Sequence, residues 1–256
     1  MGLFSLSIRQ WGRVRLLFSL LCMCVLLVSS CASNQVTNPS ASASRNGRIT
    51  IGTTAKPRTL DPADAYELSS LSLVYNMSDR LYTYAPGSTE LKPELATALP
   101  TVSDDGLTYT IPIREGVLFH DDTKFDAKAM EFSLRRFIEN NGKPSFLLSD
   151  SVESVKATGD YELTIKLKQP FAAFPSLLAF SGVPALSPQA YEIGDGKFEP
   201  NKFVGTGPYK LAKFGTDSVR FDVFDKYWGE KPANNGITVQ ILSSGVNLYN
   251  NFRKQG

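Results

Sequence analysis

The only histidine of this 256-residue chain, His120, lies beside Asp121 and Asp122. A Ser-His-Asp hydrolase would have to use this imidazole, yet no Gly-x-Ser-x-Gly nucleophile elbow accompanies it. A zinc site of two or three histidines is excluded by the same count, and the pattern His-Glu-x-x-His does not occur. We therefore predict no catalytic residue and no metal site, and we interpret His120 as a structural or surface residue.

The glycine-containing stretches do not form a nucleotide-binding motif. Gly142-Lys143 continues into Pro144, where a Walker sequence requires Ser or Thr. Gly205-Thr206-Gly207 lacks the third glycine of a dinucleotide fingerprint and runs into Pro208, which favours a tight turn before a strand. Paired carboxylates for glycoside hydrolysis stay open, because 25 acidic residues always offer pairs. The sequence predicts no cofactor.

The first thirty residues have the composition of a secretory signal. Three arginines and no acidic residue precede a strongly apolar run of thirteen residues, Leu16 to Val28. This run is shorter than the roughly 20 residues of a membrane-spanning helix. Val28-Ser29-Ser30-Cys31 resembles the bacterial lipobox, in which the Cys is lipidated and becomes the mature N-terminus. We predict a signal peptide over 1–30 and a lipid anchor on Cys31; an ordinary cleaved signal and an uncleaved anchor helix are the alternatives.

Removal of the signal would change both the cysteine count and the charge. Cys22 and Cys24 lie inside the apolar run, so Cys31 alone would remain and no intrachain disulfide is expected. Three of the 27 basic residues also leave, so 24 basic and 25 acidic residues give a net charge of −1. Without a basic stripe, nucleic acid is not an expected partner. This balance is typical of a soluble domain that binds small ligands of mixed charge.

The elements that would position a site follow from the spacing of apolar residues. Residues 31–47 are rich in Ser, Asn, Ala and Thr and are predicted to form a flexible tether. Alternation of Ile49 and Ile51 with polar residues predicts a first strand, and Leu60-Asp61-Pro62 predicts a turn. A helix is predicted next from apolar residues at helical spacing, namely Leu68, Leu71, Val74, Tyr75 and Leu81.

Turn and cap residues predict the rest of the chain. Asp104-Asp105-Gly106 and Thr158-Gly159-Asp160 are typical of hairpin turns. Asp126 is expected to cap a helix that Asn140-Asn141-Gly142 ends. Further elements are expected as short helices near Phe174–Phe180 and Pro188–Glu192, strands over Tyr209–Phe214, Val219–Phe224 and Ile237–Leu242, and a helix after Gly245. Because strands and helices do not alternate regularly, the predicted class is mixed α/β (α+β) with partly antiparallel sheets.

Four groups of short motifs, in order across almost the whole chain after residue 47, resemble the extracellular solute-binding proteins of family 5, which serve peptide, oligopeptide and nickel importers. The groups are Pro57-Arg58-Thr59-Leu60-Asp61-Pro62; Asp104 to Ile111 with Arg114 to Asp121; Phe125-Asp126-Ala127-Lys128 with Ser133-Leu134-Arg135-Arg136; and Val204 to Leu211 with Tyr227-Trp228-Gly229. Each motif is weak alone, whereas their common order and spacing are specific. Most of their residues have scaffold roles, so the motifs identify a fold more than a chemical site.

The resemblance implies a clamp of periplasmic-binding-protein type II, in which two lobes close over a ligand and a sub-domain is inserted into the first lobe. By that analogy, residues 48–77 and 201–256 form the core of lobe I, and residues 78–200 form the inserted sub-domain. Family members are much longer than this chain. We therefore expect the second lobe to be missing from this sequence, as in a fragment, a frameshifted gene or one half of a split protein.

The implied function is capture of peptides, from dipeptides to oligopeptides, and their delivery to a membrane permease driven by a separate ATPase of the ABC type. In resembling proteins the stretch after the Leu-Asp-Pro turn contacts the ligand, so Tyr66, Glu67 and Leu68 are candidate ligand-binding residues. Glu67 would pair with a ligand amino group; the alternative is that Tyr66 and Glu67 only begin a helix. Phe146, in the inserted sub-domain, is a fourth candidate.

Three alternatives to peptide binding stay open. Nickel or another small solute is the alternative within the family, although a single histidine gives nickel little support. A secreted hydrolase or carbohydrate-binding lipoprotein is the alternative from another class. Weak or absent binding would follow from a missing second lobe. In each case we expect an exported chain, periplasmic or otherwise extracytoplasmic, held at the membrane through Cys31.

Overall fold

The computed structural model describes residues 47–255, so the predicted signal peptide over 1–30, Cys31 and nearly all of the tether over 31–47 lie outside it. The described helices are α2 (Leu68–Met77), α3 (Ala127–Glu139), α4 (Phe146–Ser149), α5 (Phe174–Leu177) and α6 (Gly245–Gln255). The strands are β1 (Ile49–Thr53), β2 (Tyr82–Tyr84), β3 (Leu91–Pro93), β4 (Thr101–Val102), β5 (Thr108–Pro112), β6 (Val152–Gly159), β7 (Glu162–Leu167), β8 (Tyr209–Phe214), β9 (Ser218–Val223) and β10 (Gly236–Ile241). The predicted mixed class is confirmed. None of the helices in this part of the chain is long and apolar enough to cross a membrane.

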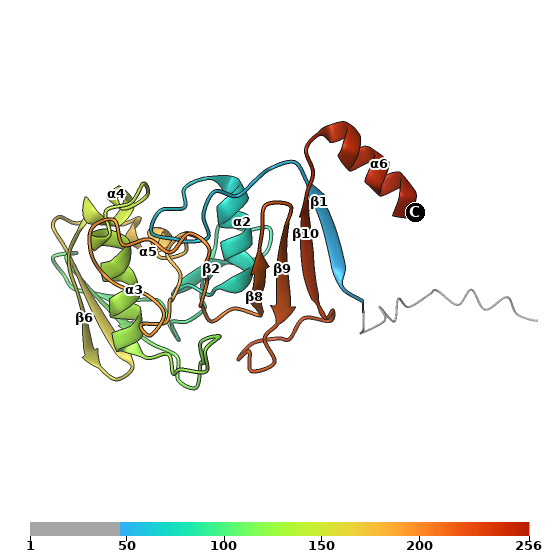
Figure 1. Cartoon of the computed structure of the whole chain (residues 1–256). Coiled ribbons are helices and arrows are strands. Elements are labelled where there is room, and N and C mark those ends of the chain that lie inside the picture. Colours follow the sequence, from blue (N-terminus) through green and yellow to red (C-terminus); the bar gives the residue numbers. More distant parts are fainter. Residues whose placement is uncertain (1–46, 256) are drawn as a thin grey trace, which may run out of the picture. The chain divides into compact units, whose positions relative to one another are not determined.

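Strands from both ends of the described chain build one four-stranded sheet in the order β1-β10-β9-β8 (Figure 1). β1 runs parallel to β10, whereas β10, β9 and β8 are antiparallel neighbours. Helix α2 buries Leu73, Val74 and Met77 in one apolar cluster with side chains of β8, β9 and β10. β1 forms an edge of this sheet, and its Ile49 and Ile51 are each 46% exposed.

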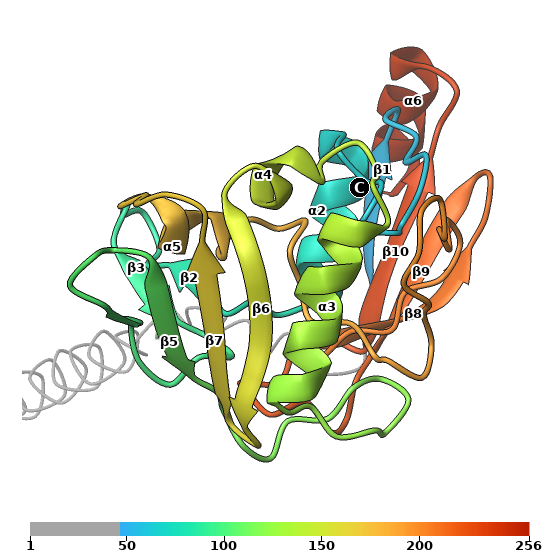
Figure 2. The ribbon, with the colours of Figure 1, turned by 90° about the vertical axis from the view of Figure 1, so that its left-hand side faces the viewer.

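The middle of the chain forms a second, fully antiparallel sheet in the order β4-β5-β7-β6, together with the separate pair β2-β3. Helix α3 packs along β6 and β7 (Figure 2). The predicted hairpin turn at Gly106 is confirmed, with a φ of 69° that favours glycine. The predicted cap is confirmed too, because the side chain of Asp126 accepts a hydrogen bond from the amide of Ala129 at 2.8 Å.

Helix α2 is shorter than predicted and rotated from the expected face. It ends at Met77, so Leu81 lies beyond it, in the apolar cluster of the second sheet. The physical reason is a close crossing of chain segments, since the amide of Gly207 donates to the carbonyl of Met77 at 3.1 Å. The buried face carries Ser70, Leu73, Val74 and Met77, whereas Leu68 and Tyr75 point away from the core.

The helix expected near Pro188–Glu192 is a single turn. The residues after this turn form hydrogen bonds with other segments of the chain instead. The hydroxyl of Tyr191 donates to the carbonyl of Lys202 at 3.3 Å, and the carbonyl of Glu192 accepts from the guanidinium of Arg136. The strands predicted in the last third of the chain, and the helix after Gly245, are confirmed to within one or two residues.

Candidate functional site

Two of the predicted site residues, Tyr66 and Phe146, form an exposed aromatic pair. Their ring centroids lie 5.8 Å apart with an interplanar angle of 89°, which is an edge-to-face contact. Tyr66 lies in the loop before α2, and Phe146 is the first residue of α4. The two residues are 48% and 45% exposed. The fold therefore brings two rings from distant parts of the sequence together and leaves both accessible.

Glu67 immediately precedes α2, and its carboxylate already has partners. It accepts hydrogen bonds from the hydroxyl of Ser70 at 2.7 Å and from the amide of Tyr66 at 3.1 Å. The guanidinium of Arg58 lies 3.7 Å from it. Partial burial alone would raise the pKa of Glu67, but these contacts lower it below its ordinary value, so the group is anionic at neutral pH. A ligand cation would have to compete with Arg58 for Glu67.

Leu68 borders an apolar groove between α2 and β1. This residue is 83% exposed, although it is the first residue of the helix. The groove has a volume of about 520 Å³, and it is lined by Ile51, Thr53, Ala55, Pro57, Leu68, Ser69, Ser72, Leu73, Asn76, Phe221, Ile237 and Val239. Its size and lining suit an apolar side chain, with hydroxyl and amide groups at hand for orientation.

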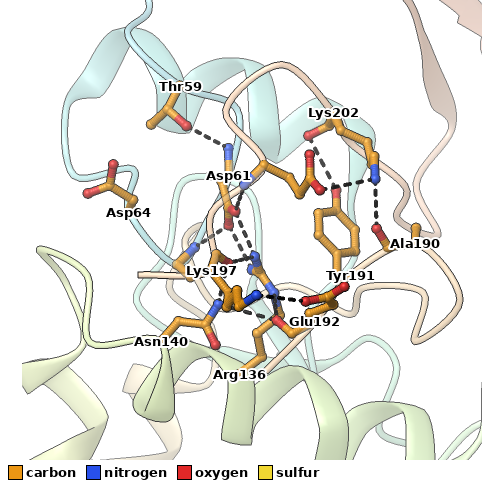
Figure 3. A network of polar contacts seen from close by, with 12 residues as sticks. Thr59, Asp61, Asp64, Arg136, Asn140, Ala190, Tyr191, Glu192, Lys197 and Lys202 are labelled. Atoms are coloured by element: carbon orange, nitrogen blue, oxygen red, sulfur yellow. Dashed lines mark hydrogen bonds and ion pairs between the residues drawn. The ribbon is translucent and has the colours of Figure 1, made fainter. Parts of the chain in front are cut away.

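A buried ion pair joins the loop that leads to Tyr66 to helix α3. The two carboxylate oxygens of Asp61 each accept a hydrogen bond of 2.7 Å from Arg136, and both side chains are completely buried (Figure 3). Such a bidentate contact is among the strongest that side chains form. Because burying either charge alone would be costly, the two residues stabilise the fold only as a pair.

Backbone groups are the remaining hydrogen-bond partners of this ion pair. Asp61 accepts from the amides of Ala63 at 3.0 Å and Glu199 at 2.6 Å. Arg136 donates to the carbonyls of Glu192 at 3.1 Å and Lys197 at 2.9 Å. The side chain of Asn140 donates to the same two carbonyls and accepts from the amide of Gly194. The network therefore ties the Asp61 loop, the end of α3 and residues 192–199 together (Figure 3).

His120 has the structural role that the sequence indicates. The amide of Gly205 donates to its Nδ1 at 3.3 Å, which leaves the proton on Nε2, and Nε2 donates to the carbonyl of Gly207 at 3.0 Å. Burial lowers the pKa of His120 to about 4 in spite of the bond to Gly207. Both ring nitrogens thus form hydrogen bonds with the backbone of residues 205–207. Among residues 47–255, no group of three or more His, Cys, Asp or Glu is arranged to hold a metal ion.

A second buried carboxylate, Asp79, was not apparent from the sequence. It accepts hydrogen bonds from the hydroxyls of Thr206 at 2.9 Å and Tyr227 at 3.1 Å, and from the indole of Trp228 at 2.9 Å. Burial raises the pKa of Asp79, although these three donors oppose the shift. All three donors belong to motifs of the family resemblance, which was the available signal for a buried acceptor.

Arg58 and Asp64 are further charged residues at the site that the sequence reasoning missed. Arg58 donates to the carboxylate of Asp64 at 2.5 Å and to its carbonyl at 2.7 Å. With Glu67 they form a cluster of one cation and two anions just before α2, in which Arg58 is exposed and both carboxylates are partly buried. The signal was that Arg58 and Asp64 lie within ten positions of the predicted ligand-contacting stretch Tyr66-Glu67-Leu68.

Known proteins resemble the chain in both sequence and fold. The bacterial extracellular solute-binding proteins, family 5 (Middle), match residues 90–256. The glutathione-binding protein GsiB of Salmonella paratyphi A is 38% identical over 174 residues, which are 66% of this chain and 33% of that protein. GsiB of Escherichia coli K12 is 37% identical over 177 residues, with the same coverage. The chain thus spans about a third of the length of the curated relatives it matches.

Two solved structures of periplasmic binding proteins of type II share the fold of this chain over less than half of their own length. The periplasmic binding protein DppA of Helicobacter pylori, in complex with the peptide STSA, has a TM-score of 0.74 and 25% identity, and the match covers 84% of this chain and 47% of DppA. NikZ of Campylobacter jejuni, in complex with Ni(L-His), has a TM-score of 0.72 and 23% identity, over 81% of this chain and 42% of NikZ. The chain belongs to the bacterial extracellular solute-binding proteins of family 5.

Proposed function

We propose that this chain contributes one wall of a ligand site in an ABC-type importer, where it captures peptides or peptide-like molecules for a membrane permease. The observation that carries the proposal is the exposed edge-to-face pair of Tyr66 and Phe146 next to an anionic Glu67 and an apolar groove. Rigid aromatic rings grip extended ligands without demanding one side chain. No covalent step is part of the mechanism, because ligand capture and release need only binding.

Each group on this wall would contact a different part of a peptide. The rings of Tyr66 and Phe146 would pack on the ligand main chain or an apolar side chain. Glu67 would bind the ligand ammonium in place of Arg58, which lies at the long ion-pair distance of 3.7 Å and is easily displaced. Leu68 and the groove between α2 and β1 would receive an apolar side chain. A peptide with a free amino group therefore fits the wall.

The domain organisation and the location are part of the same proposal. Residues 48–77 and 201–256 would form the core of lobe I, and residues 78–200 its inserted sub-domain, which agrees with the division of strands between the two four-stranded sheets. Export through the signal over 1–30 and lipidation of Cys31 would keep the chain at the membrane, beside its permease. One acyl chain binds a membrane only marginally, so several would be needed.

Calorimetric titration of the whole chain with glutathione and with the tetrapeptide Ser-Thr-Ser-Ala tests the proposal. We expect binding of at least one probe, weakened about tenfold by Tyr66→Ala or Phe146→Ala, as an aromatic contact of about 1.4 kcal/mol implies. Tyr84→Ala is the matched control, because Tyr84 is 43% exposed but lies on β2, outside the site. Binding of neither probe, or an equal loss in the control, would contradict the proposed function.

A further inference from the structure

We propose that the buried ion pair of Asp61 and Arg136 is the element that positions the aromatic pair for its ligand. This inference rests on the proposed function, because it takes Tyr66 and Phe146 to be part of the ligand site. Asp61 and Arg136 are positioning residues here. They touch no ligand and act through the two loops that carry the rings.

The ion pair is a rigid anchor because of its geometry and burial. Two parallel hydrogen bonds of 2.7 Å join the fork of Arg136 to both oxygens of Asp61, and neither side chain is exposed. A planar fork held at two points permits little rotation. The loop between β1 and α2, which contains Asp61, is therefore held in one position relative to the end of α3.

From this anchor, Asp61 holds the turn that leads to Tyr66. Its side chain accepts from the amide of Ala63, and its carbonyl accepts from the amides of Asp64 at 3.1 Å and Ala65 at 2.8 Å. Three successive amides are thus bonded to one residue. Tyr66 follows directly, so the start of its backbone is set by the orientation of Asp61.

Arg136 reaches Phe146 through the C-terminal end of α3. The amide of Asn140 donates to the carbonyl of Arg136 at 3.0 Å, and the side chain of Asn140 shares the carbonyl of Lys197 with Arg136. The chain then turns at Gly142, whose carbonyl accepts from the amide of Ser145 at 3.1 Å. Phe146 is the next residue, at the start of α4.

The two loops also meet in a direct backbone contact. A Cβ added at Gly142 would lie 2.0 Å from the carbonyl oxygen of Ala63, so only glycine allows this approach. The ion pair and the Gly142–Ala63 contact together fix the separation of the two loops. The edge-to-face geometry of Tyr66 and Phe146 follows from this spacing. A wall that is already ordered loses less conformational entropy when a ligand binds.

Hydrogen exchange of the ligand-free whole chain, read by mass spectrometry, tests the positioning directly. Arg136→Lys keeps the charge but lacks the second arm of the fork, and Asp61→Asn keeps the size of the side chain but removes its charge and one of its two acceptor oxygens. For each we expect faster exchange, by about tenfold or more, in both residues 61–66 and 142–149, together with weaker binding of glutathione and Ser-Thr-Ser-Ala. Ile165→Val, in the buried part of β7, is the control for a general loss of stability.

The outcomes separate this inference from the proposed function. Unchanged exchange in both loops, or the same change in Ile165→Val at equal melting temperature, overturns the positioning role. Faster exchange with unchanged binding also overturns it, because the order of the wall would then not matter to the ligand. If the unaltered chain binds neither probe, the proposed function fails, while exchange alone still decides whether the ion pair orders both loops. If one of the two variants does not fold, the other decides in its place.

Discussion

Replacement of His120 by Gln should change how the stability of the protein depends on pH. In the folded protein Nδ1 must stay unprotonated to accept from the amide of Gly205, so protonation of the ring breaks this bond. Burial lowers the pKa of His120 from 6.5 to about 4. Between these values the unfolded chain binds a proton that the folded chain does not. The free energy of unfolding therefore falls as the pH drops from 6.5 to 4.

The size of this effect follows from the shift in pKa. A shift of one pKa unit corresponds to about 1.4 kcal/mol, so the titration of His120 should lower the free energy of unfolding by up to about 3 kcal/mol at acid pH. Glu94 acts in the opposite direction. Burial raises its pKa from 4.5 to about 7, with Asp79 adding to the shift and Arg80 opposing it. The contribution of Glu94 to the free energy of unfolding is present below pH 4.5 and is lost as the pH rises through 7. The effects of Glu94 and His120 therefore nearly offset each other in the unaltered chain.

The informative quantity is consequently the difference between the unaltered chain and His120→Gln, measured by urea unfolding at several pH values. At pH 7 the variant should be less stable by about 1 kcal/mol, because Gln keeps the donor to Gly207 and loses the acceptor for Gly205. At pH 4 it should be the more stable of the two, since it has no group to protonate. A difference that stays constant from pH 7 to pH 4 would refute the reasoning that His120 is held neutral.

Three further predictions concern single contacts. Glu94→Gln should lose less stability than the unaltered chain when the pH rises from 5 to 8, as measured by urea unfolding, because it has no buried carboxyl to ionise. Asp126→Ala should lower the free energy of unfolding by about 1 kcal/mol through loss of the helix cap, and no change in the urea midpoint would contradict this. Gly207→Ala should prevent folding, because its Cβ would lie 2.4 Å from the carbonyl carbon of Met77. Gly245→Ala, at an open position, should leave circular dichroism and melting unchanged.

Local signals in the sequence were sufficient for most elements. Gly106 in a hairpin turn and Asp126 at a helix start act on residues only a few positions away, so their effect can be read without knowing the fold. The strands after Gly207 were predicted for the same reason. Helix α2 shows the limit of such reasoning. Its end at Met77 depends on contact with Gly207, a residue far away in the sequence.

The residues of the candidate site were chosen from the sequence, but the contacts between them were not predicted. Tyr66 and Phe146 were chosen separately, and nothing local indicated that their rings would meet. The ion pair of Asp61 and Arg136 was also missed as a pair, although Arg136 shares a helical face with the buried Ser133 and Asn140. A charged residue at such a position indicates a buried partner. Its identity requires the tertiary fold, because Asp61 precedes α3 by more than sixty residues.

The residues of the motifs and those of the proposed ligand wall differ in how deeply they are buried. Asp61, Arg136 and Gly207 belong to the motifs, and each makes buried contacts that the fold requires. Tyr66 and Phe146 lie outside the motifs, and their rings are half exposed. Substitutions in the first set should therefore reduce stability before they affect ligand choice. Substitutions in the second set should alter which peptide binds at little cost in stability, because an exposed side chain contributes little to folding.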